Sequence, residues 1–298
     1  MQTFKATHLV YSFSKDNPVY DRLIPGEVYA IETVDCYRNQ LVEEHTGDPA
    51  VMPIKGINPV TGPFYIEGAE SGDTLAVDIL DIHVEDVGTI YLRPGSALYG
   101  KMLAHAEVRR IPIGEEEVLL PGGFRIPKEP MIGVIGTTPA EEAVSTISPG
   151  RHGGNMDTRL ITAGSRLYLP VFVDGALFAL GDLHAAMGDG ESGCCGVEVA
   201  GRVKLRFQVI KGRQEPWPFL ETRERWVSIA SGLTLDEAAR EAGLAMLAFL
   251  KKRTKASFHD LARLLSVGGH LQISQIVNDL RTARMAVAKM SIGTPVDF

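Results

Sequence analysis

Two polar residues in the middle of the chain have the types and the spacing of a metal site. Asp182 and His184 stand two positions apart, so on a β-strand their side chains point to the same face. A carboxylate and an imidazole that converge in this way can begin a divalent-metal site with mixed nitrogen and oxygen ligands. Asp157 lies in a glycine-flanked loop and could complete the ligand set.

A further carboxylate, Glu191, follows a loop that contains Gly188 and Gly190, and we expect it to lie over the same spot. As a carboxylate that is not itself a ligand, it could deprotonate a metal-activated water and pass the proton to a leaving amine. Each of these residues taken alone is more often a turn former or a hydrogen-bonded surface group. The residues by themselves therefore leave both interpretations open, a metal site and a set of structural polar groups.

Other catalytic patterns do not occur in the sequence. It contains neither the H-E-x-x-H motif of zinc proteases nor the G-x-S-x-G motif of serine hydrolases. Cys194 and Cys195 are interpreted as structural thiols, because no neighbouring residue would lower their pKa. Gly133 and Gly136 lack the third glycine and the following helix of a dinucleotide-binding fingerprint.

Composition narrows the functional classes further. The chain has 298 residues and a formal net charge of -7, which argues against non-specific nucleic-acid binding. No secretory signal is visible at the N-terminus, and the most apolar stretch is too short and too interrupted for a membrane span. Three cysteines cannot form a disulfide framework and suit a reducing compartment. We therefore expect a cytoplasmic protein that binds neither nucleic acid nor membrane.

The elements that must position the candidate residues are mostly strands. Residues 29–34 are rich in β-formers, residues 74–82 alternate in their second half, and residues 58–63 predict a turn. The apolar stretch 167–183 predicts two buried strands that form a hairpin around Asp174-Gly175. Residues 197–210 alternate throughout and predict one long strand with a bulge at Gly201.

Helices are expected only near the end of the chain. Thr234 and Glu237 have capping-box spacing and precede an amphipathic stretch that ends at residues 251–253, which predicts a first helix. A second helix is predicted from Ser257 to Leu265. A strand is predicted after it, at residues 271–277. The predicted fold is α+β and β-dominated, with antiparallel sandwich or barrel-like sheets and a short helical pair near the C-terminus. The predicted organisation is an N-terminal β-rich segment (1–130), a glycine-rich catalytic core (131–230) and a final segment (231–298) packed on that core.

Several long motifs resemble the acetamidase/formamidase family. They are similar to the family's motifs in the same order along nearly the whole chain: residues 58–63, 67–75, 132–136, 148–157, 167–171, 181–191, 264–266 and 273–285. The resemblance implies a β-rich hydrolase of the C–N bond of small aliphatic amides, with zinc as the metal. It also implies a cytoplasmic homo-oligomer, often a dimer.

Carried over by position, the resemblance assigns metal binding to Asp157, Asp182 and His184 and proton transfer to Glu191. Three further candidates are weaker. Asp35 matches a family aspartate near the N-terminus and could face the same cleft, and Glu67 could also belong to the site or only shape a turn. His152 could orient a ligand from behind it or cap a turn.

The sequence departs from the family pattern at a few positions. Leu183 and Met187 flank His184 where many members have other residues, and His270 stands where aspartate is commoner. We expect Leu183 and Met187 to make the pocket more apolar, which favours longer amides or a lactam. The alternative is a small-amide binding protein on the same fold that does not catalyse turnover, and a third hypothesis is a structural role in an oligomer.

Overall fold

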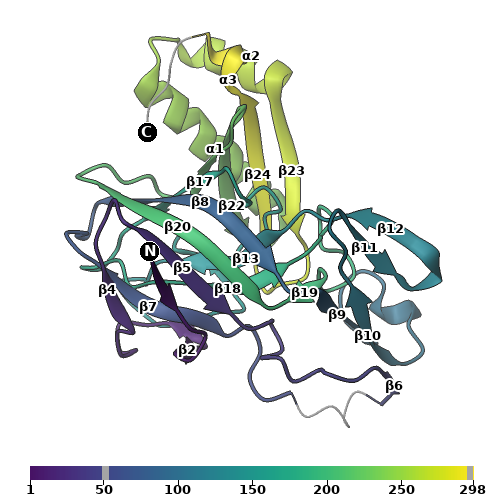
Figure 1. Cartoon of the computed structure of the whole chain (residues 1–298). Helices are drawn as coiled ribbons and strands as arrows, with labels where there is room; N and C mark the ends of the chain where they lie inside the picture. Colours follow the sequence, from purple (N-terminus) through teal and green to yellow (C-terminus); the bar gives the residue numbers. More distant parts are fainter. Residues whose placement is uncertain (49–53, 294–297) are drawn as a thin grey trace.

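Two large β-sheets make up most of the molecule, and three helices lie beside one end of the first sheet (Figure 1). The computed structural model describes residues 1–48, 54–293 and 298. Among the strand pairs of these residues, β1–β5 and β4–β7 are parallel and the others are antiparallel. The expected α+β, β-dominated fold with antiparallel sheets and a late helical pair is confirmed.

The first sheet has nine strands and takes them from all three segments predicted along the chain. The long central pair β20–β8 lies beside strands from the N-terminal, middle and C-terminal parts, so the division into three segments stays a prediction. In sheet order the strands are β1 (Gln2–Phe4), β5 (Val28–Thr33), β20 (Gly201–Ile210), β8 (Thr74–Val84), β17 (Arg166–Pro170), β21 (Phe219–Glu221), β22 (Arg225–Gly232), β24 (Arg281–Ala288) and β23 (Gly269–Gln275).

The second sheet has eleven strands and contains β18, which carries two of the predicted site residues. Its main path is β15 (Pro149–Gly150), β16 (Gly153–Asn155), β13 (Met131–Gly136), β18 (Phe178–His184), β19 (Glu198–Val199), β9 (Val87–Leu92), β10 (Ala106–Pro112) and β6 (His45–Gly47). β7 (Val60–Ile66) pairs with β18, β2 (Leu9–Val10) and β4 (Asp21–Leu23). Two short pairs complete the strands: β11 (Glu117–Leu120) with β12 (Phe124–Pro127), and β3 (Ser12–Phe13) with β14 (Val144–Ser145).

The main hydrophobic core draws side chains from both large sheets. It includes Val77 and Ile79 of β8, Leu205 of β20, and Phe178 and Leu180 of β18. Burying such side chains is the dominant favourable contribution to folding. The sheets therefore form a rigid frame, and β18 stands in it with every residue buried.

The two long helices begin where the sequence predicts, and the second continues past its expected end at Leu265 to Gly268. Thr234 caps α1 (Leu235–Arg253) by accepting a hydrogen bond from the backbone N–H of Glu237, and the Glu237 carboxylate accepts one from the N–H of Leu233. Ser257 caps α2 (Phe258–Gly268) in the same way, and a short α3 (Lys289–Ile292) follows β24. The buried face of α1 packs on β22 and β24. None of the helices among the described residues is long and apolar enough to cross a membrane.

Three of the strand predictions need correction. The strands around Asp174-Gly175 do not form a hairpin, because β17 pairs with β8 and β21 in the first sheet while β18 lies in the second. The two strands are both buried, but the turn carries the chain from one sheet to the other. The predicted turn at 58–63 is strand from Val60 onward. The long strand 197–210 is interrupted at Ala200, and its bulge lies between Lys204 and Leu205, not at Gly201.

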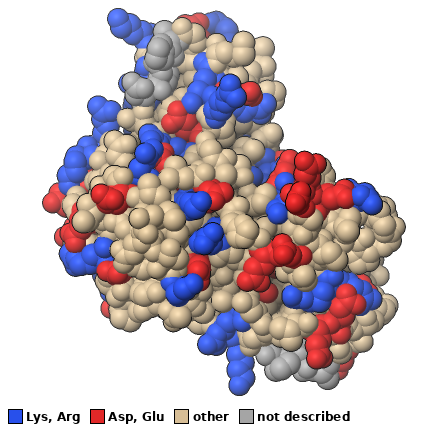
Figure 2. Space-filling model, in the orientation of Figure 1, with Lys and Arg blue, Asp and Glu red and all other residues tan. Residues whose placement is uncertain are grey.

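Charged side chains of both signs are interspersed over the face of the molecule in Figure 2. Many of them form ion pairs across neighbouring strands, as Lys204 does with Asp81 and Arg166 with Asp78. Pairs of this kind that remain in contact with solvent contribute about 0 to 1 kcal/mol each to stability. The buried carboxylates and the imidazole of the candidate site lie elsewhere, at the end of β18.

Candidate active site

The end of β18 brings Asp182 and His184 together, as their spacing predicts. Nε2 of His184 lies 3.6 Å from Oδ1 of Asp182, and both side chains are buried. The strand pairing also places Glu198 of β19 directly opposite His184. Directly paired residues in an antiparallel sheet present their side chains on the same face. Nε2 of His184 accordingly lies 3.0 Å from Oε1 of Glu198.

Glu191 reaches the same place from a loop that the C-terminal strands hold. The backbone N–H of Gly190 donates to the carbonyl of Ser274 (2.9 Å), and the N–H of Ile276 donates to the carbonyl of Gly190 (3.1 Å). The buried guanidinium of Arg284 on β24 pairs with Asp189 at 2.6 Å. Residues more than eighty positions further along the chain therefore position the Glu191 loop.

Asp157, His184 and Glu191 form one tight group. Each offers a donor atom within 4.8 Å of the others, and all three side chains are buried. Nδ2 of Asn278 donates a hydrogen bond to Oδ2 of Asp157 at 2.9 Å, and Nδ2 of Asn58 donates to Oδ2 of Asp182 at 3.3 Å. These amides orient the two aspartates and leave their other oxygens facing the group.

Several buried polar atoms of this region lack a hydrogen-bond partner among the described residues. They are Oδ1 of Asp157, Nδ1 of His184, Oε2 of Glu191 and Oε2 of Glu198. Buried polar groups are ordinarily paired, because an unpaired carboxylate loses its hydration without compensation. Carboxylate oxygens and imidazole nitrogens are also the donors that divalent metals such as zinc bind. The residues present therefore fit a divalent cation.

The backbone at these residues adopts an uncommon conformation. The φ angles of Asp157, Asp182 and Glu191 are 42°, 57° and 47°. These values lie in the left-handed region, which residues other than glycine rarely adopt. Such conformations cost of order 1–3 kcal/mol each and cluster at functional sites. Three of the four predicted site residues share this strain, which favours a functional interpretation over a set of ordinary turn formers.

Burial shifts the acidities of the group strongly. Burial, together with the charge of Asp182, raises the pKa of Asp157 to about 6. Burial and the neighbouring Glu198 raise the pKa of Asp182 to about 7. Burial opposes protonation of His184, but the carboxylates of Glu198 and Asp182 raise its pKa well above the ordinary value. Burial and Asp157 also raise the pKa of Glu191 well above its ordinary value.

These shifts predict the pH dependence of the protein stripped of metal. A group whose pKa is raised on folding binds protons more tightly in the folded state, so its contribution to stability falls as pH rises through that pKa. Burial lowers the pKa of His152 to about 4, so the contribution of His152 to stability increases as pH rises. This increase ends near pH 6.5, the ordinary pKa of histidine. We expect the melting temperature of stripped protein to fall between about pH 6.5 and about pH 8.

Zinc-loaded protein is the control for this measurement. Bound carboxylates are ionised in the folded state and metal binding releases protons, so zinc should stabilise more at the higher pH. Differential scanning calorimetry at both pH values, with and without zinc, checks the prediction. A stripped protein that melts at higher temperature at pH 8 would contradict it.

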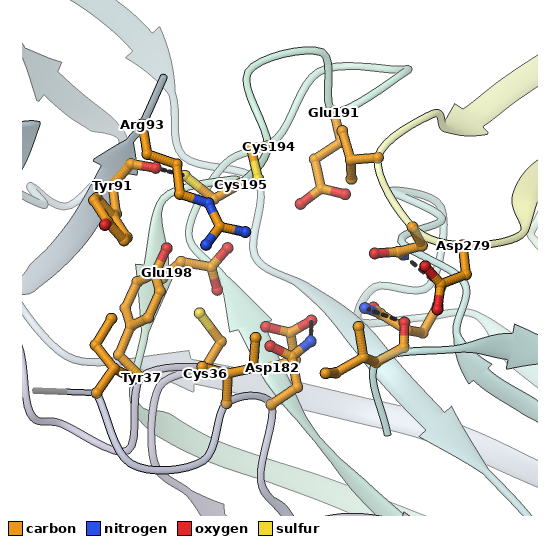
Figure 3. Close-up of a pocket in the computed structure, with 17 residues that line it drawn as sticks. Cys36, Tyr37, Tyr91, Arg93, Asp182, Glu191, Cys194, Cys195, Glu198 and Asp279 are labelled. Atoms are coloured by element: carbon orange, nitrogen blue, oxygen red, sulfur yellow. Dashed lines mark hydrogen bonds between the residues drawn. The ribbon is translucent and has the colours of Figure 1, made fainter. Parts of the chain in front are cut away.

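A pocket of about 370 Å³ opens beside the group (Figure 3). Asp182, Glu191 and Glu198 line it, and the guanidinium of Arg93 points into it. The remaining lining residues combine apolar and amide side chains with all three cysteines of the chain: Cys36, Tyr37, Ile54, Ile57, Asn58, Tyr91, Ile147, Asn155, Cys194, Cys195, Val277, Asn278 and Asp279. A pocket of this size can accept a small organic molecule.

The sequence did not point to Glu198 and Cys36. Glu198 lies between two buried valines. In an alternating strand, this position indicates a side chain that faces solvent. The structure instead buries this face of β19 against the candidate site. Cys36 lies in the loop after β5 and is buried against the pocket. Burial raises the pKa values of Cys36, Cys194 and Cys195, in agreement with the interpretation of Cys194 and Cys195 as structural thiols.

The three weaker candidates lie outside the tight group. Asp35 is buried, but its Oδ1 accepts hydrogen bonds from the N–H groups of Tyr37 and Asn39, so it shapes the loop that carries Cys36. Glu67 pairs with Arg22 at 2.6 Å near the surface. His152 packs edge-on against Phe13, and its Nε2 has no partner among the described residues.

The departures from the family pattern lie away from the pocket wall. Leu183 packs in the main core between the sheets. Neither Leu183 nor Met187 is among the described residues that line the pocket, so they do not make its wall more apolar. His270 is exposed on β23.

Comparisons with known proteins agree with the fold. The model of the Acetamidase/Formamidase family matches residues 5–142 and 127–223. An acetamidase structure from Bacillus halodurans is similar with a TM-score of 0.94 and 43% identity, covering 98% of each chain. The structure of a predicted acetamidase/formamidase from Thermoanaerobacter tengcongensis is similar with a TM-score of 0.93 and 39% identity, covering 98% of this chain and 97% of that chain.

Among curated proteins, a formamidase from Methylophilus methylotrophus is 25% identical over 294 residues, covering 76% of this chain and 72% of its own. The similarity therefore extends through both large sheets and through the strands and loops that carry Asp157, Asp182, His184 and Glu191. The chain belongs to the acetamidase/formamidase family.

Proposed function

We propose that this protein hydrolyses the C–N bond of small aliphatic amides to a carboxylate and ammonia, with a divalent cation, zinc, at Asp157, Asp182 and His184. Family membership supports amide hydrolysis. The observation that carries the metal is the set of buried donor atoms without hydrogen-bond partners around His184. The small pocket that opens beside them supports a small substrate.

The residues around the proposed cation would have separate roles in binding and catalysis. Asp157, Asp182 and His184 hold the cation, and Asn278 and Asn58 orient the two aspartates. A divalent cation there supplies Lewis acidity, which polarises the amide carbonyl and lowers the pKa of a water molecule. Glu191 faces these donors from its own loop.

Glu191 is the proposed proton carrier. Its carboxylate accepts a proton from the attacking water as the water oxygen bonds to the carbonyl carbon. It then gives that proton to the amide nitrogen as the C–N bond breaks, so that nitrogen leaves as ammonia. No other acid is needed for this transfer, and the carboxylic acid that forms loses its remaining proton to solvent to give the carboxylate.

The direct test is ammonia release from a panel that runs from formamide through butyramide, with ring opening measured for a lactam. Protein is stripped with a chelator and then reloaded with zinc. Activity that disappears with the metal and returns with zinc is the expected result. Preference for the lactam would shift the substrate class, and tight zinc binding without turnover of any amide would favour the binding-protein alternative.

Arg284 offers a test of how the Glu191 loop is positioned. Replacing it by Met removes the ion pair with Asp189 and the hydrogen bonds to Ser274 and Ile273, so Glu191 loses its support. We expect kcat to fall about 10-fold, a loss typical of residues that orient catalytic groups, with zinc content unchanged. Steady-state kinetics and elemental analysis measure both.

Two further variants make the Arg284 result interpretable. Arg263→Met removes an exposed pair with Asp260 on α2 and should leave kcat unchanged. Asp189→Asn weakens the same ion pair with little change in volume and should reproduce the effect if Arg284→Met folds poorly. Unchanged kcat in both Arg284→Met and Asp189→Asn would remove the pair from the positioning role.

We further propose that the protein is a cytoplasmic homodimer. The three cysteines are unpaired, which suits a reducing compartment. Val267 at the end of α2 and Leu271 and Ile273 on the edge strand β23 are exposed apolar residues, and exposed apolar surface of this kind supports association between subunits. Light scattering should give twice the 32.4 kDa mass of one chain.

A further inference from the structure

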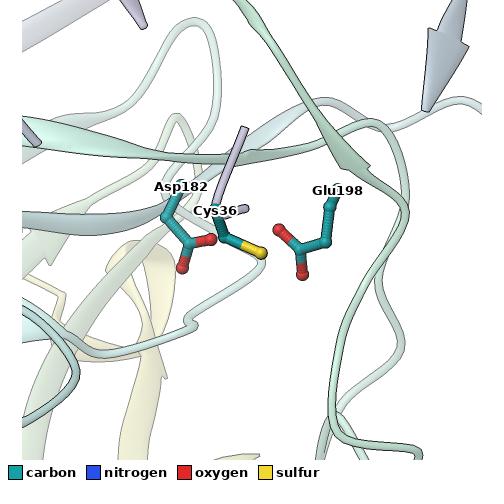
Figure 4. Close-up of side chains that lie close together, drawn as sticks. All are labelled: Cys36, Asp182 and Glu198. Atoms are coloured by element: carbon teal, nitrogen blue, oxygen red, sulfur yellow. The ribbon is translucent and has the colours of Figure 1, made fainter. Parts of the chain in front are cut away.

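A second group of potential ligands lies on the pocket wall beside the proposed zinc position. Cys36, Asp182 and Glu198 each offer a donor atom within 4.8 Å of the others, and all three are buried. Figure 4 shows the sulfur of Cys36 between the two carboxylates. Neither Cys36 nor Glu198 takes part in the amide hydrolysis proposed above.

The fold holds these three side chains from separate elements. Glu198 is fixed by the pairing of β19 with β18, and Asp182 belongs to β18 itself. Cys36 follows β5 in a loop that Asp35 braces through two backbone hydrogen bonds. The carbonyl of Cys36 also accepts a hydrogen bond from the N–H of Asn58 at 2.8 Å. The group is therefore built into the frame.

One oxygen of this group lacks the partner that a buried polar atom needs. Oε1 of Glu198 accepts a hydrogen bond from the N–H of Gly196 at 3.2 Å and lies 3.0 Å from Nε2 of His184. Glu198 is 2% exposed, and its Oε2 has no hydrogen-bond partner among the described residues. Among the described residues that line the pocket, Arg93 is the one cationic side chain, and it contacts Cys194. A buried carboxylate oxygen without a partner is costly unless a cation or a donor compensates it.

Charge also favours more than one cation. Four carboxylates are buried around a single histidine, and a histidine that binds metal through nitrogen is neutral. When all four are ionised, one divalent cation offsets half of their charge. The four are Asp157, Asp182, Glu191 and Glu198.

We propose that Cys36, Asp182 and Glu198 bind a second divalent cation, one that accepts a thiolate ligand, next to the cation of the proposed function. The inference rests on that function, because Asp182 would serve both positions. Paired cations in hydrolytic sites lie about 3.5–4 Å apart. A thiolate selects zinc, cobalt or cadmium over magnesium and calcium, and Cys36 releases its proton to solvent on binding.

Cobalt gives a readout independent of turnover. A cobalt–thiolate bond produces a charge-transfer absorption in the near ultraviolet, and elemental analysis counts the cations per chain. We expect two cobalt ions per chain in the wild-type protein, together with the thiolate band. Cys36→Ser should lose the band and one cobalt ion. Magnesium and calcium should leave this position empty in competition with cobalt.

Matched variants identify the thiol and guard against misfolding. Cys195→Ser changes another cysteine of the same pocket and should keep the band and both ions. Glu198→Gln keeps the size of the side chain and should lose the same ion, which tests the position if Cys36→Ser does not fold. Circular dichroism verifies the fold of each variant.

The proposal fails if wild-type protein binds one cobalt ion, or if the band persists in Cys36→Ser. These outcomes are separate from the test of the proposed function. One ion per chain with zinc-dependent ammonia release would overturn the second position and leave the hydrolase intact. Two ions with the thiolate band but no amide turnover would support the second position and overturn the proposed hydrolysis.

Discussion

Replacing Glu191 by Gln should lower kcat for amide hydrolysis by about 10²–10⁴-fold while zinc content stays at the wild-type level. The carboxylate lines the pocket and is 6% exposed, and its Oε2 has no hydrogen-bond partner among the described residues. Glutamine has the same shape but can neither accept a proton from water nor return it to the leaving nitrogen. Asp157, Asp182 and His184 would continue to hold the metal. Ammonia release and elemental analysis on the same preparation measure the two quantities.

Glu67→Gln is the matched control for this substitution. Glu67 is the other glutamate that the sequence suggested for the site, and the structure places it in an ion pair with Arg22 near the surface. Exposed pairs contribute little to stability, so kcat should stay near the wild-type value. Wild-type turnover in Glu191→Gln would exclude the proton-transfer role. Loss of zinc together with turnover would instead make Glu191 a ligand.

The sequence predicts the elements of this site better than their assembly. The D-x-H spacing of Asp182 and His184 on a strand was enough to place them side by side, because strand periodicity is local. The capping residues Thr234 and Ser257 likewise predicted where the two long helices begin. The glycine-flanked loops suggested Asp157 and Glu191 as partners, and the resemblance to the family gave them roles. The structure brings donor atoms of both within 4.8 Å of His184.

The features that the sequence did not reveal depend on pairing between distant segments. The apolar stretch 167–183 looked like a hairpin because both strands are buried, but burial does not say which sheet a strand joins. Glu198 became a site residue only through its register opposite His184. Cys36 comes from a loop nearly 150 residues away from Asp182. Alternation in one strand carries no information about such pairings.

Gly133 on β13 lies close to two of the proposed metal ligands. A Cβ atom at this position would lie 2.6 Å from both Oδ1 of Asp157 and Oδ2 of Asp182, a distance that real Cβ atoms essentially never show. We expect Gly133→Ala to push the two carboxylates apart and to lower zinc affinity about 10- to 100-fold, the range seen when the surroundings of metal ligands are disturbed. Competition with a zinc chelator measures the affinity.

The effect of Gly133→Ala should be steric and local. Gly188→Ala is the control, because it lies in the loop that leads to Glu191 and its added Cβ would meet nothing within 4 Å. It should bind zinc like the wild-type protein. Added zinc should restore turnover in Gly133→Ala, since the proposed proton carrier Glu191 is unchanged and only the zinc occupancy is lowered. Wild-type zinc affinity in Gly133→Ala would mean that Asp157 and Asp182 do not hold the metal together, and the ligand set would then have to exclude one of them.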